Sequence, residues 1–176
     1  FDGDVEFTDS VFREDAVFRG SEFNGGTNYL ESDVVFDTVT FTHPAKFSNT
    51  DIVSIEFRAT EFQSTVDFTD AEITETLIIN TPTFRDDQYL DFTDATIEEG
   101  TIVQPERGWG YFYFTQATVG DVSLVAANQT DRRELLDYFR FCDTTFDRFD
   151  FSQHLEYLDR NDWILHTFSE PETGYT

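Results

Sequence analysis

The sequence predicts an all-β repeat fold, built from short strands and turns that recur along the chain. Phenylalanine recurs at spacings of five and six residues, beginning with Phe7, Phe12, Phe18 and Phe23. Neither the 3.6-residue period of a helix nor the two-residue period of an ordinary strand produces this spacing. The apolar side chains are therefore expected to line one side of a repeating turn-and-strand path.

The same spacing continues in aliphatic residues, which can replace phenylalanine in a core. The further centres of the repeat are Phe36, Phe41, Phe47, Ile52, Phe57, Phe62, Phe68, Ile73, Ile79, Phe84, Phe92, Ile97, Ile102, Phe114, Val119 and Leu124. A small or medium side chain often lies two residues earlier, as Val66 does before Phe68. Both members of such a pair point to one side of an extended segment, so both are expected inside. The residues between them, such as Glu56, are expected to face water.

Two segments show the repeating unit most clearly: AVFRGSEF at residues 16–23 and STVDFTDAEI at residues 64–73. They resemble the pentapeptide-repeat proteins, whose unit is a small residue, any residue, Phe or Leu, and two polar residues. The resemblance covers roughly residues 5–124. It implies a right-handed quadrilateral β-solenoid, in which four units make one square coil and the central rings stack inside.

The chain is expected to divide into a solenoid, residues 1–127, and a C-terminal cap, residues 128–176. In the cap, capping residues and an apolar stripe predict a helix over 130–140, and the Phe spacing returns over 141–151 as a final partial coil. A second short helix is expected over 152–160. Such a cap covers the open strand edges of a solenoid. The alternative, a homodimer formed through the cap, stays open.

The charge balance is extreme. The chain has 36 acidic residues, 21 of them Asp, against ten Arg and one Lys, and its net charge is −25. This composition resembles proteins of extreme halophiles, in which hydrated acids keep the chain soluble and molar salt screens their repulsion. The sequence therefore favours a cytoplasmic protein of a high-salt, archaeal organism.

A competing interpretation of the acidity is mimicry of DNA, because some pentapeptide-repeat proteins act as DNA mimics on type II topoisomerases. Residues 1–127 hold 25 acids and six bases, a net charge of −19. A rod of about 25 Å would carry them, and duplex DNA has about 15 charges over that length. Residues 128–176 are also acidic, with 11 acids and five bases. Acidity spread through every segment suits a halophilic surface better than a mimic.

The segment RGWGYFYF, residues 107–114, is the most suggestive candidate for a binding surface. Alternate side chains in a strand face opposite sides, so its rings cannot all enter a narrow coil. They either pack beneath the cap or form an exposed aromatic patch for a protein partner. The candidate partner-binding residues are Trp109, Tyr111, Tyr113 and, in the cap, Trp163. The surrounding negative charge disfavours direct nucleic-acid binding.

Other residues give no sign of catalytic, cofactor or metal chemistry. The three histidines lack metal-ligand spacing, and the adjacent acids Asp86-Asp87 and Glu98-Glu99 are expected to be solvated turn charges, a weak cation site being the alternative. Cys142, the single cysteine, is expected to be a small buried residue.

The whole pattern indicates a non-catalytic structural or protein-interaction module. The sequence contains no apolar run of about 18 residues, the length that predicts a membrane-spanning helix. The chain begins at Phe1 with the repeat already running, and it is therefore expected to be part of a longer polypeptide.

Overall fold

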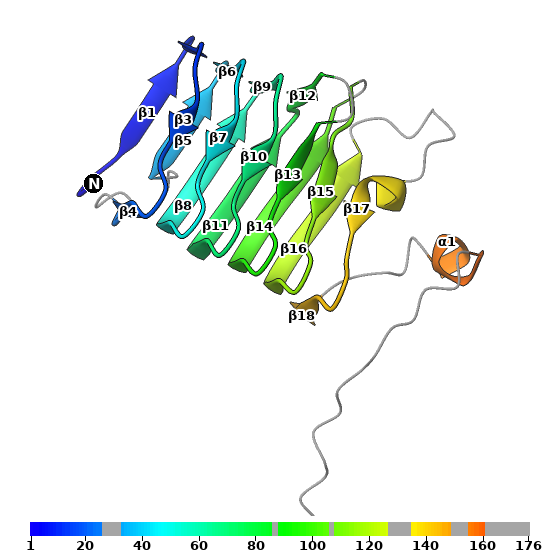
Figure 1. The fold of residues 1–176 in the computed structure, drawn as a ribbon. Coiled ribbons are helices and arrows are strands. Elements are labelled where there is room, and N and C mark those ends of the chain that lie inside the picture. The colour runs from blue at the N-terminus through cyan, green and yellow to red at the C-terminus, as the bar shows by residue number, and fades with distance from the viewer. Residues whose placement is uncertain (26–32, 86–87, 106–107, 127–134, 149–154, 161–176) are drawn as a thin grey trace, which may run out of the picture.

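The computed structural model of this chain is a β-solenoid, in which successive coils stack along one axis (Figure 1). The structure describes residues 1–25, 33–85, 88–105, 108–126, 135–148 and 155–160. Within these ranges every strand pair is parallel. The solenoid predicted from the Phe spacing is confirmed.

Three sheets form the walls of the solenoid. The widest contains β1 (Val5–Thr8), β5 (Val34–Asp37), β8 (Asp51–Arg58), β11 (Glu72–Asn80), β14 (Thr96–Gln104), β16 (Thr118–Ala126) and β18 (Thr145–Arg148), with β4 (Glu22–Phe23) paired to β8. The second contains β3 (Ala16–Val17), β7 (Ala45–Lys46), β10 (Val66–Asp67), β13 (Tyr89–Asp91), β15 (Tyr111–Tyr113) and β17 (Phe139–Arg140). The third contains β2 (Val11–Phe12), β6 (Thr40–Phe41), β9 (Glu61–Phe62) and β12 (Thr83–Phe84).

The strand registers place the repeat centres in four inward columns, one for each face of the coil. The face 1 column is Phe1, Phe23, Ile52, Ile73, Ile97, Val119 and Phe146. The face 2 column is Phe7, Phe36, Phe57, Ile79, Ile102 and Leu124. The face 3 column is Phe12, Phe41, Phe62 and Phe84, and the face 4 column is Phe18, Phe47, Phe68, Phe92, Phe114 and Phe141. Faces 1 and 2 share the widest sheet, face 3 is the third sheet and face 4 is the second.

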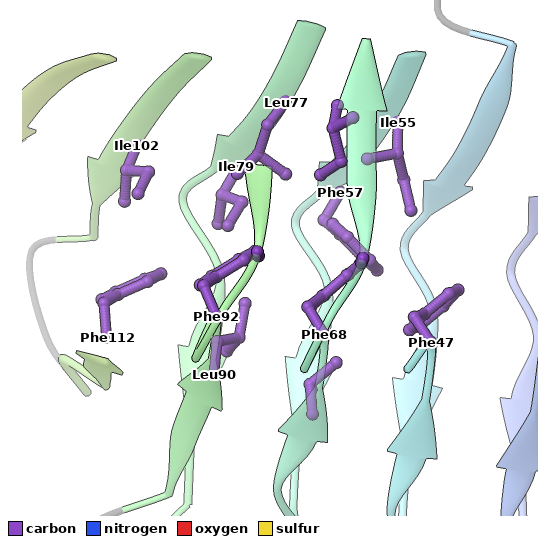
Figure 2. Close-up of a cluster of buried hydrophobic side chains, with 14 of the residues drawn as sticks. Phe47, Ile55, Phe57, Phe68, Leu77, Ile79, Leu90, Phe92, Ile102 and Phe112 are labelled. Atoms are coloured by element: carbon purple, nitrogen blue, oxygen red, sulfur yellow. The ribbon is translucent and has the colours of Figure 1, made fainter. Parts of the chain in front are cut away.

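Rings within a column stack nearly parallel. The ring centroids of Phe47 and Phe68 are 4.7 Å apart, and those of Phe68 and Phe92 are 4.9 Å apart. Figure 2 shows these rings in a row, with Phe57 and Ile79 of face 2 above them. Because stacked strands are about 4.8 Å apart, the backbone ladder and the ring stack have the same repeat.

Left-handed corners accompany a spacing of five at two of the four corners of the coil. Two residues after each of the first four face 2 centres the backbone has positive φ, at Asp9, Thr38, Ala59 and Thr81. The same holds two residues after the face 4 centres, at Gly20, Asn49, Asp70, Asp94, Gln116 and Asp143. From Asp9 to Gln116, the backbone N–H of each of these corner residues donates to a carbonyl of the next coil. Thr38, for example, donates to Arg58 at 2.9 Å. The distance from one centre to the next across these two corners is always five residues.

The spacing of six occurs between faces 3 and 4 in the first three coils, and between faces 1 and 2 both five and six occur. Phe41 on face 3 and Phe47 on face 4 are six residues apart, and none of the residues between them has positive φ. Between faces 1 and 2 the register shifts inside β11, between Ile73 and Thr76, which accommodates one extra residue. The spacing is therefore five at the two left-handed corners and six between faces 3 and 4 in the first three coils, whereas between faces 1 and 2 it is five from Ile52 to Phe57 and six from Ile73 to Ile79.

The core changes where the face 3 sheet ends at β12. The residues two before the face 4 centres are small in the first coils and large in the later ones: Ala16, Ala45, Val66, Leu90, Phe112 and Phe139. The larger side chains fill the volume that further face 3 centres would have occupied, since a protein interior tolerates few voids. Leu90 and Phe112 are fully buried.

The C-terminal part differs from the helix predicted over 130–140. Of these residues, Leu135–Tyr138 form a 3-10 helix, η1, and Phe139 and Arg140 form strand β17; the remainder lie outside the described ranges. Phe139 belongs to the core because its ring stacks on Phe112, with centroids 5.0 Å apart. The partial coil expected over 141–151 is confirmed as far as Arg148 by β18, and the helix expected over 152–160 is confirmed over Leu155–Arg160 as α1; residues 149–154 lie outside the described ranges.

The expectation that Glu56 faces water is wrong. It lies on the outer side of β8, but its side chain is only 8% exposed because Arg58 lies across it. The guanidinium binds both carboxylate oxygens, with Nε to Oε1 at 2.5 Å and Nη2 to Oε2 at 2.7 Å. A bidentate arginine of this kind satisfies a carboxylate that has been withdrawn from water.

Replacement of a central ring should cost far more than replacement of a terminal one. Phe68→Ala removes a fully buried ring that stacks on two neighbours, and it should lower the free energy of unfolding by about 3–5 kcal/mol. Phe1→Ala, at a ring that is 62% exposed, is the control and should cost much less. Urea unfolding at constant salt measures both, and equal losses would contradict the column model.

Relief of strain at a corner should stabilise the protein. Thr81 is exposed and has φ of 48°, a conformation that is unfavourable for a β-branched residue and tolerated by Asn. Thr81→Asn should raise the free energy of unfolding by about 0.5–1 kcal/mol. Thr83→Asn, two residues later in β12, should instead destabilise, because Asn is unfavourable in strands. The same sign for both substitutions would contradict this account.

Candidate protein-binding surface

Face 4 carries a cluster of outward tyrosines on its C-terminal half. We call Tyr89, Tyr111, Tyr113 and Tyr138 the tyrosine surface. Tyr89 and Tyr111 are register partners on β13 and β15, and Tyr138 immediately precedes Phe139, the register partner of Phe112. All four side chains are partly exposed.

The tyrosine rings form two stacked pairs. The centroids of Tyr89 and Tyr113 are 4.7 Å apart, with planes 19° from parallel. Those of Tyr111 and Tyr138 are 5.1 Å apart, with planes 28° from parallel. Three of these residues are anchored in strands, and η1 holds the fourth, so the rings are held in place before any partner arrives.

Trp109 lies beneath this surface rather than on it. It is 8% exposed, and its indole packs edge-on against Tyr138 with centroids 5.0 Å apart. Its Nε1–H donates to the carbonyl of Pro105 at 2.5 Å. Of the two arrangements considered for the aromatic segment, packing describes Trp109, and partial exposure describes Tyr111 and Tyr113.

Glycine at position 110 allows the loop to close over the core. A Cβ there would lie 2.4 Å from the ring of Phe84, the last centre of face 3. The carbonyl of Gly110 accepts a hydrogen bond from Nε2 of buried Gln104 at 2.8 Å. The end of the face 3 sheet, the glycine and the buried indole therefore form one packing unit that supports the tyrosine surface.

Carboxylates lie beside the tyrosines in the adjacent outward column. Asp91 on β13 is the register partner of Tyr113, and Asp67 on β10 is the register partner of Asp91 one coil earlier. Each carboxylate accepts a hydrogen bond from the backbone N–H two residues later in the chain, Asp67 from Thr69 and Asp91 from Thr93, both at 3.0 Å. The surface thus combines aromatic faces with fixed negative charge.

Positive charge lies at both ends of this column, because Arg140 on β17 is the register partner of Tyr113 and Lys46 lies on β7. Lys46 precedes Asp67 in the same column, and its Nζ donates to the carboxylate of Asp15 at 2.6 Å. This hydrogen bond lowers the pKa of Asp15 from its ordinary value, while desolvation opposes the shift. The pair adds stability above the ordinary Asp pKa and loses it as pH falls through the lowered value, and the effect is small because both groups are accessible.

The other candidate residues are placed as follows. Trp163, Asp86, Asp87, His154 and His166 lie outside the described ranges. Cys142 is exposed, so the expectation of a buried cysteine is wrong: it follows Phe141, which points inward, and therefore points outward.

Glu98 and Glu99 line an open hollow of about 270 Å³ on face 1, beside Gly120, Asp121, Asp147 and Arg148. Arg148 Nη1 lies 3.2 Å from Asp121 Oδ2. Among the residues that the structure describes, no three His, Cys, Asp or Glu side chains are arranged to hold a metal ion. The same residues include no helix long and apolar enough to cross a membrane.

Comparisons with family models, with curated proteins and with solved structures find no match to this chain in any of the three.

Sequence reasoning missed Tyr89 and Tyr138, although a signal for both was present. Tyr89, Tyr111 and Tyr138 each lie three residues before a face 4 centre, namely Phe92, Phe114 and Phe141. Residues three before a centre point outward in the register of face 4. Recognition that these centres belong to one face would have identified the cluster.

Trp109 and Tyr113 should separate packing from surface exposure. Trp109→Ala should lower the free energy of unfolding by about 3–5 kcal/mol, because it removes a buried ring and its hydrogen bond. Tyr113→Ala should cost about 1 kcal/mol or less, since it removes a partly exposed ring from an outer face. Urea unfolding at constant salt tests both. Equal costs would show that the two rings share one environment.

Proposed function

We propose that this chain is a non-catalytic, right-handed pentapeptide-repeat module of a halophilic protein, and that it binds a protein partner through the tyrosine surface. The observation that carries the proposal is the gathering of four partly exposed tyrosines on one half of one face. Tyrosine supplies large contact area at low cost in side-chain entropy, and it is enriched in protein interfaces.

The chemistry of the surface also indicates the kind of partner. Asp91 is the register partner of Tyr113, and Asp67 lies one coil before it, so an incoming Arg or Lys can contact an aromatic face and a carboxylate on this side, away from Arg140 on the other side of Tyr113. In direct contact, the acidic surface favours a positively charged partner segment and disfavours nucleic acid. A partner segment bearing Arg or Lys fits both features.

The membership and habitat parts of the proposal have separate support. Four inward columns and corners that repeat every coil agree with the pentapeptide-repeat resemblance. A single lysine and 36 acids agree with a halophilic surface. The proposal of a longer parent chain rests on the sequence alone.

Binding can be tested with the double variant Tyr111→Ser, Tyr113→Ser. Proteins captured from an extract of the source cells in molar KCl would be identified, and their direct binding to purified protein measured. The double variant should weaken binding at least tenfold, equivalent to about 1.4 kcal/mol or more. Ile78→Ser, on the outer side of face 2, is the control and should bind normally. Equal binding by all three proteins would contradict the proposal.

Charge repulsion between coils should appear as a salt requirement. Glu22, Asp51 and Glu72 are register partners on three neighbouring strands, so their carboxylates repel across about 4.8 Å. In low salt, Asp51→Asn should raise the free energy of unfolding by about 0.3–1 kcal/mol, and molar KCl should abolish the gain.

The control for this prediction is Glu61→Gln on face 3. The register partners of Glu61 are Thr40 and Thr83, so it has no acid above or below it in its column. Its substitution should change stability little at either salt concentration. A gain from Asp51→Asn that persists in molar KCl would show that the effect is not repulsion.

DNA mimicry is the alternative function, and its support is the charge density of the solenoid. The arrangement of the acids argues against it: in the registers of the described strands, acids occupy at most three successive coils of an outward column. The outward column of face 1, for example, continues from Glu72 into Thr96 and Thr118, which are not acids. Inhibition of gyrase supercoiling in molar salt would support mimicry, and no inhibition at large excess would exclude it.

A further inference from the structure

The outward charges on the C-terminal half of face 4 follow a regular order along the solenoid axis. Asp91, Tyr113 and Arg140 are register partners on the neighbouring strands β13, β15 and β17 (Figure 1). Each follows one core residue and precedes another, so all three side chains point outward. Arg140 is exposed, and Asp91 and Tyr113 are partly exposed. The column is therefore an acid, a ring and a base, separated by the strand spacing of about 4.8 Å.

This order is its own complement when it is reversed. A twofold axis along β15, midway between two facing copies, reverses the solenoid axis and leaves the strand direction unchanged. It places Tyr113 opposite its own copy, and Asp91 of each copy opposite Arg140 of the other. Facing sheets pack about 10 Å apart, a gap that an arginine and an aspartate side chain can span together. The axis thus gives two identical ion pairs, as a twofold interface requires.

The remaining tyrosines also match under this axis. Tyr89, Tyr111 and Tyr138 form the neighbouring outward column on the same three coils. Reversal places Tyr111 opposite its own copy and Tyr89 opposite Tyr138 of the other copy. All four residues of the tyrosine surface then meet aromatic rings of the second copy, which suits the enrichment of tyrosine in protein interfaces.

The third outward column lets the two faces approach. It consists of the residues directly after the face 4 centres: Thr93, Thr115 and Cys142. These side chains are small and uncharged, so none of them blocks the contact or leaves a charge without a partner in it. Under the same axis Thr115 lies opposite its own copy and Thr93 opposite Cys142.

We propose that the partner of the tyrosine surface is a second copy of this chain, packed face to face about the twofold axis along β15. This inference rests on the proposed function, because it names an occupant for the surface described there. That function calls for a partner that brings Arg or Lys to an aromatic ring and a carboxylate. The surface itself carries such a residue, Arg140, next to Tyr113 in the column. A second copy therefore supplies rings opposite rings and a base opposite each Asp91.

Salt should control this association. Each copy carries a net charge of −25, so two copies repel one another in dilute buffer. In molar salt the screening length falls to about 3 Å, which removes most of the repulsion between distant acids. Contact between rings is not screened, and ion pairs enclosed in an interface are screened less than exposed ones. The dimer should therefore form in molar KCl and dissociate in dilute buffer.

The first test is sedimentation equilibrium of the 176-residue protein over a range of concentrations in molar KCl. The contact spans only three short strands, which implies a small interface and a dissociation constant in the micromolar range. Arg140→Glu places an acid opposite Asp91 and should weaken the dimer about tenfold or more. Arg13→Glu is the matched control, because it makes the same change at an exposed residue of face 3, and it should dimerise as well as the original chain.

A mixture of two variants tests the pairing directly. Asp91→Arg places a base opposite Arg140 and should also weaken the dimer. In an equimolar mixture of Asp91→Arg with Arg140→Glu, both contacts join an acid to a base. Two variants that are each monomeric alone should therefore form a mixed dimer. Cooperative urea unfolding of each variant shows that the fold is kept.

The outcomes separate this proposal from the proposed function. A monomer at every concentration in molar KCl would overturn self-association. If the purified chain stays monomeric while Tyr111→Ser, Tyr113→Ser still loses a different protein from the extract, the proposed function stands and only self-association is overturned. A dimer that is indifferent to Arg140→Glu and to the double tyrosine variant would also overturn this proposal, and would place the interface elsewhere, as at the C-terminal cap.

Discussion

Stacking of apolar side chains across coils, above all of phenylalanine on phenylalanine, is the interaction on which the rest of this structure depends. A single coil is too thin to bury a phenylalanine, because its ring is open to solvent above and below. A second coil covers it only if its own ring lies directly over the first. The backbone ladder sets that separation at about 4.8 Å, close to the distance at which two rings stack in contact. The observed separation of 4.7 Å between Phe47 and Phe68 meets both requirements.

The corners are the second constraint, because the chain must return to the same four columns in every coil. Nine residues other than glycine adopt positive φ in the described ranges, at a cost of about 1–2 kcal/mol each. The chain tolerates this strain because most of these residues donate an N–H to the next coil. Five of the nine are Asp or Asn, the residues that adopt this conformation most easily. The corner chemistry thus repeats for the same reason as the rings do.

The interior was predictable from the sequence because it is periodic, and the exceptions have local causes. Phe spacing located the columns, and the rule for residues two before a centre located Ala45 and Val66. It could not show that face 3 ends at Phe84, since that depends on how Gly110 and Trp109 fold over one ring. Nor could it show that Arg58 covers Glu56, because outward side chains have no periodic signal.

The outer surface is less constrained than the interior, and its functions depend on the interactions that persist in molar salt. In molar salt the screening length of about 3 Å is shorter than the spacing between coils, so columns of acids lose both their mutual repulsion and their reach toward a partner. Contact between apolar rings is not screened. A halophilic solenoid that recognises a partner must therefore rely on aromatic faces, with charge acting only in direct contact. The tyrosine surface on face 4 meets this condition, because its rings are stacked and partly exposed. It brings to the outer side of the solenoid the same ring stacking that builds the core.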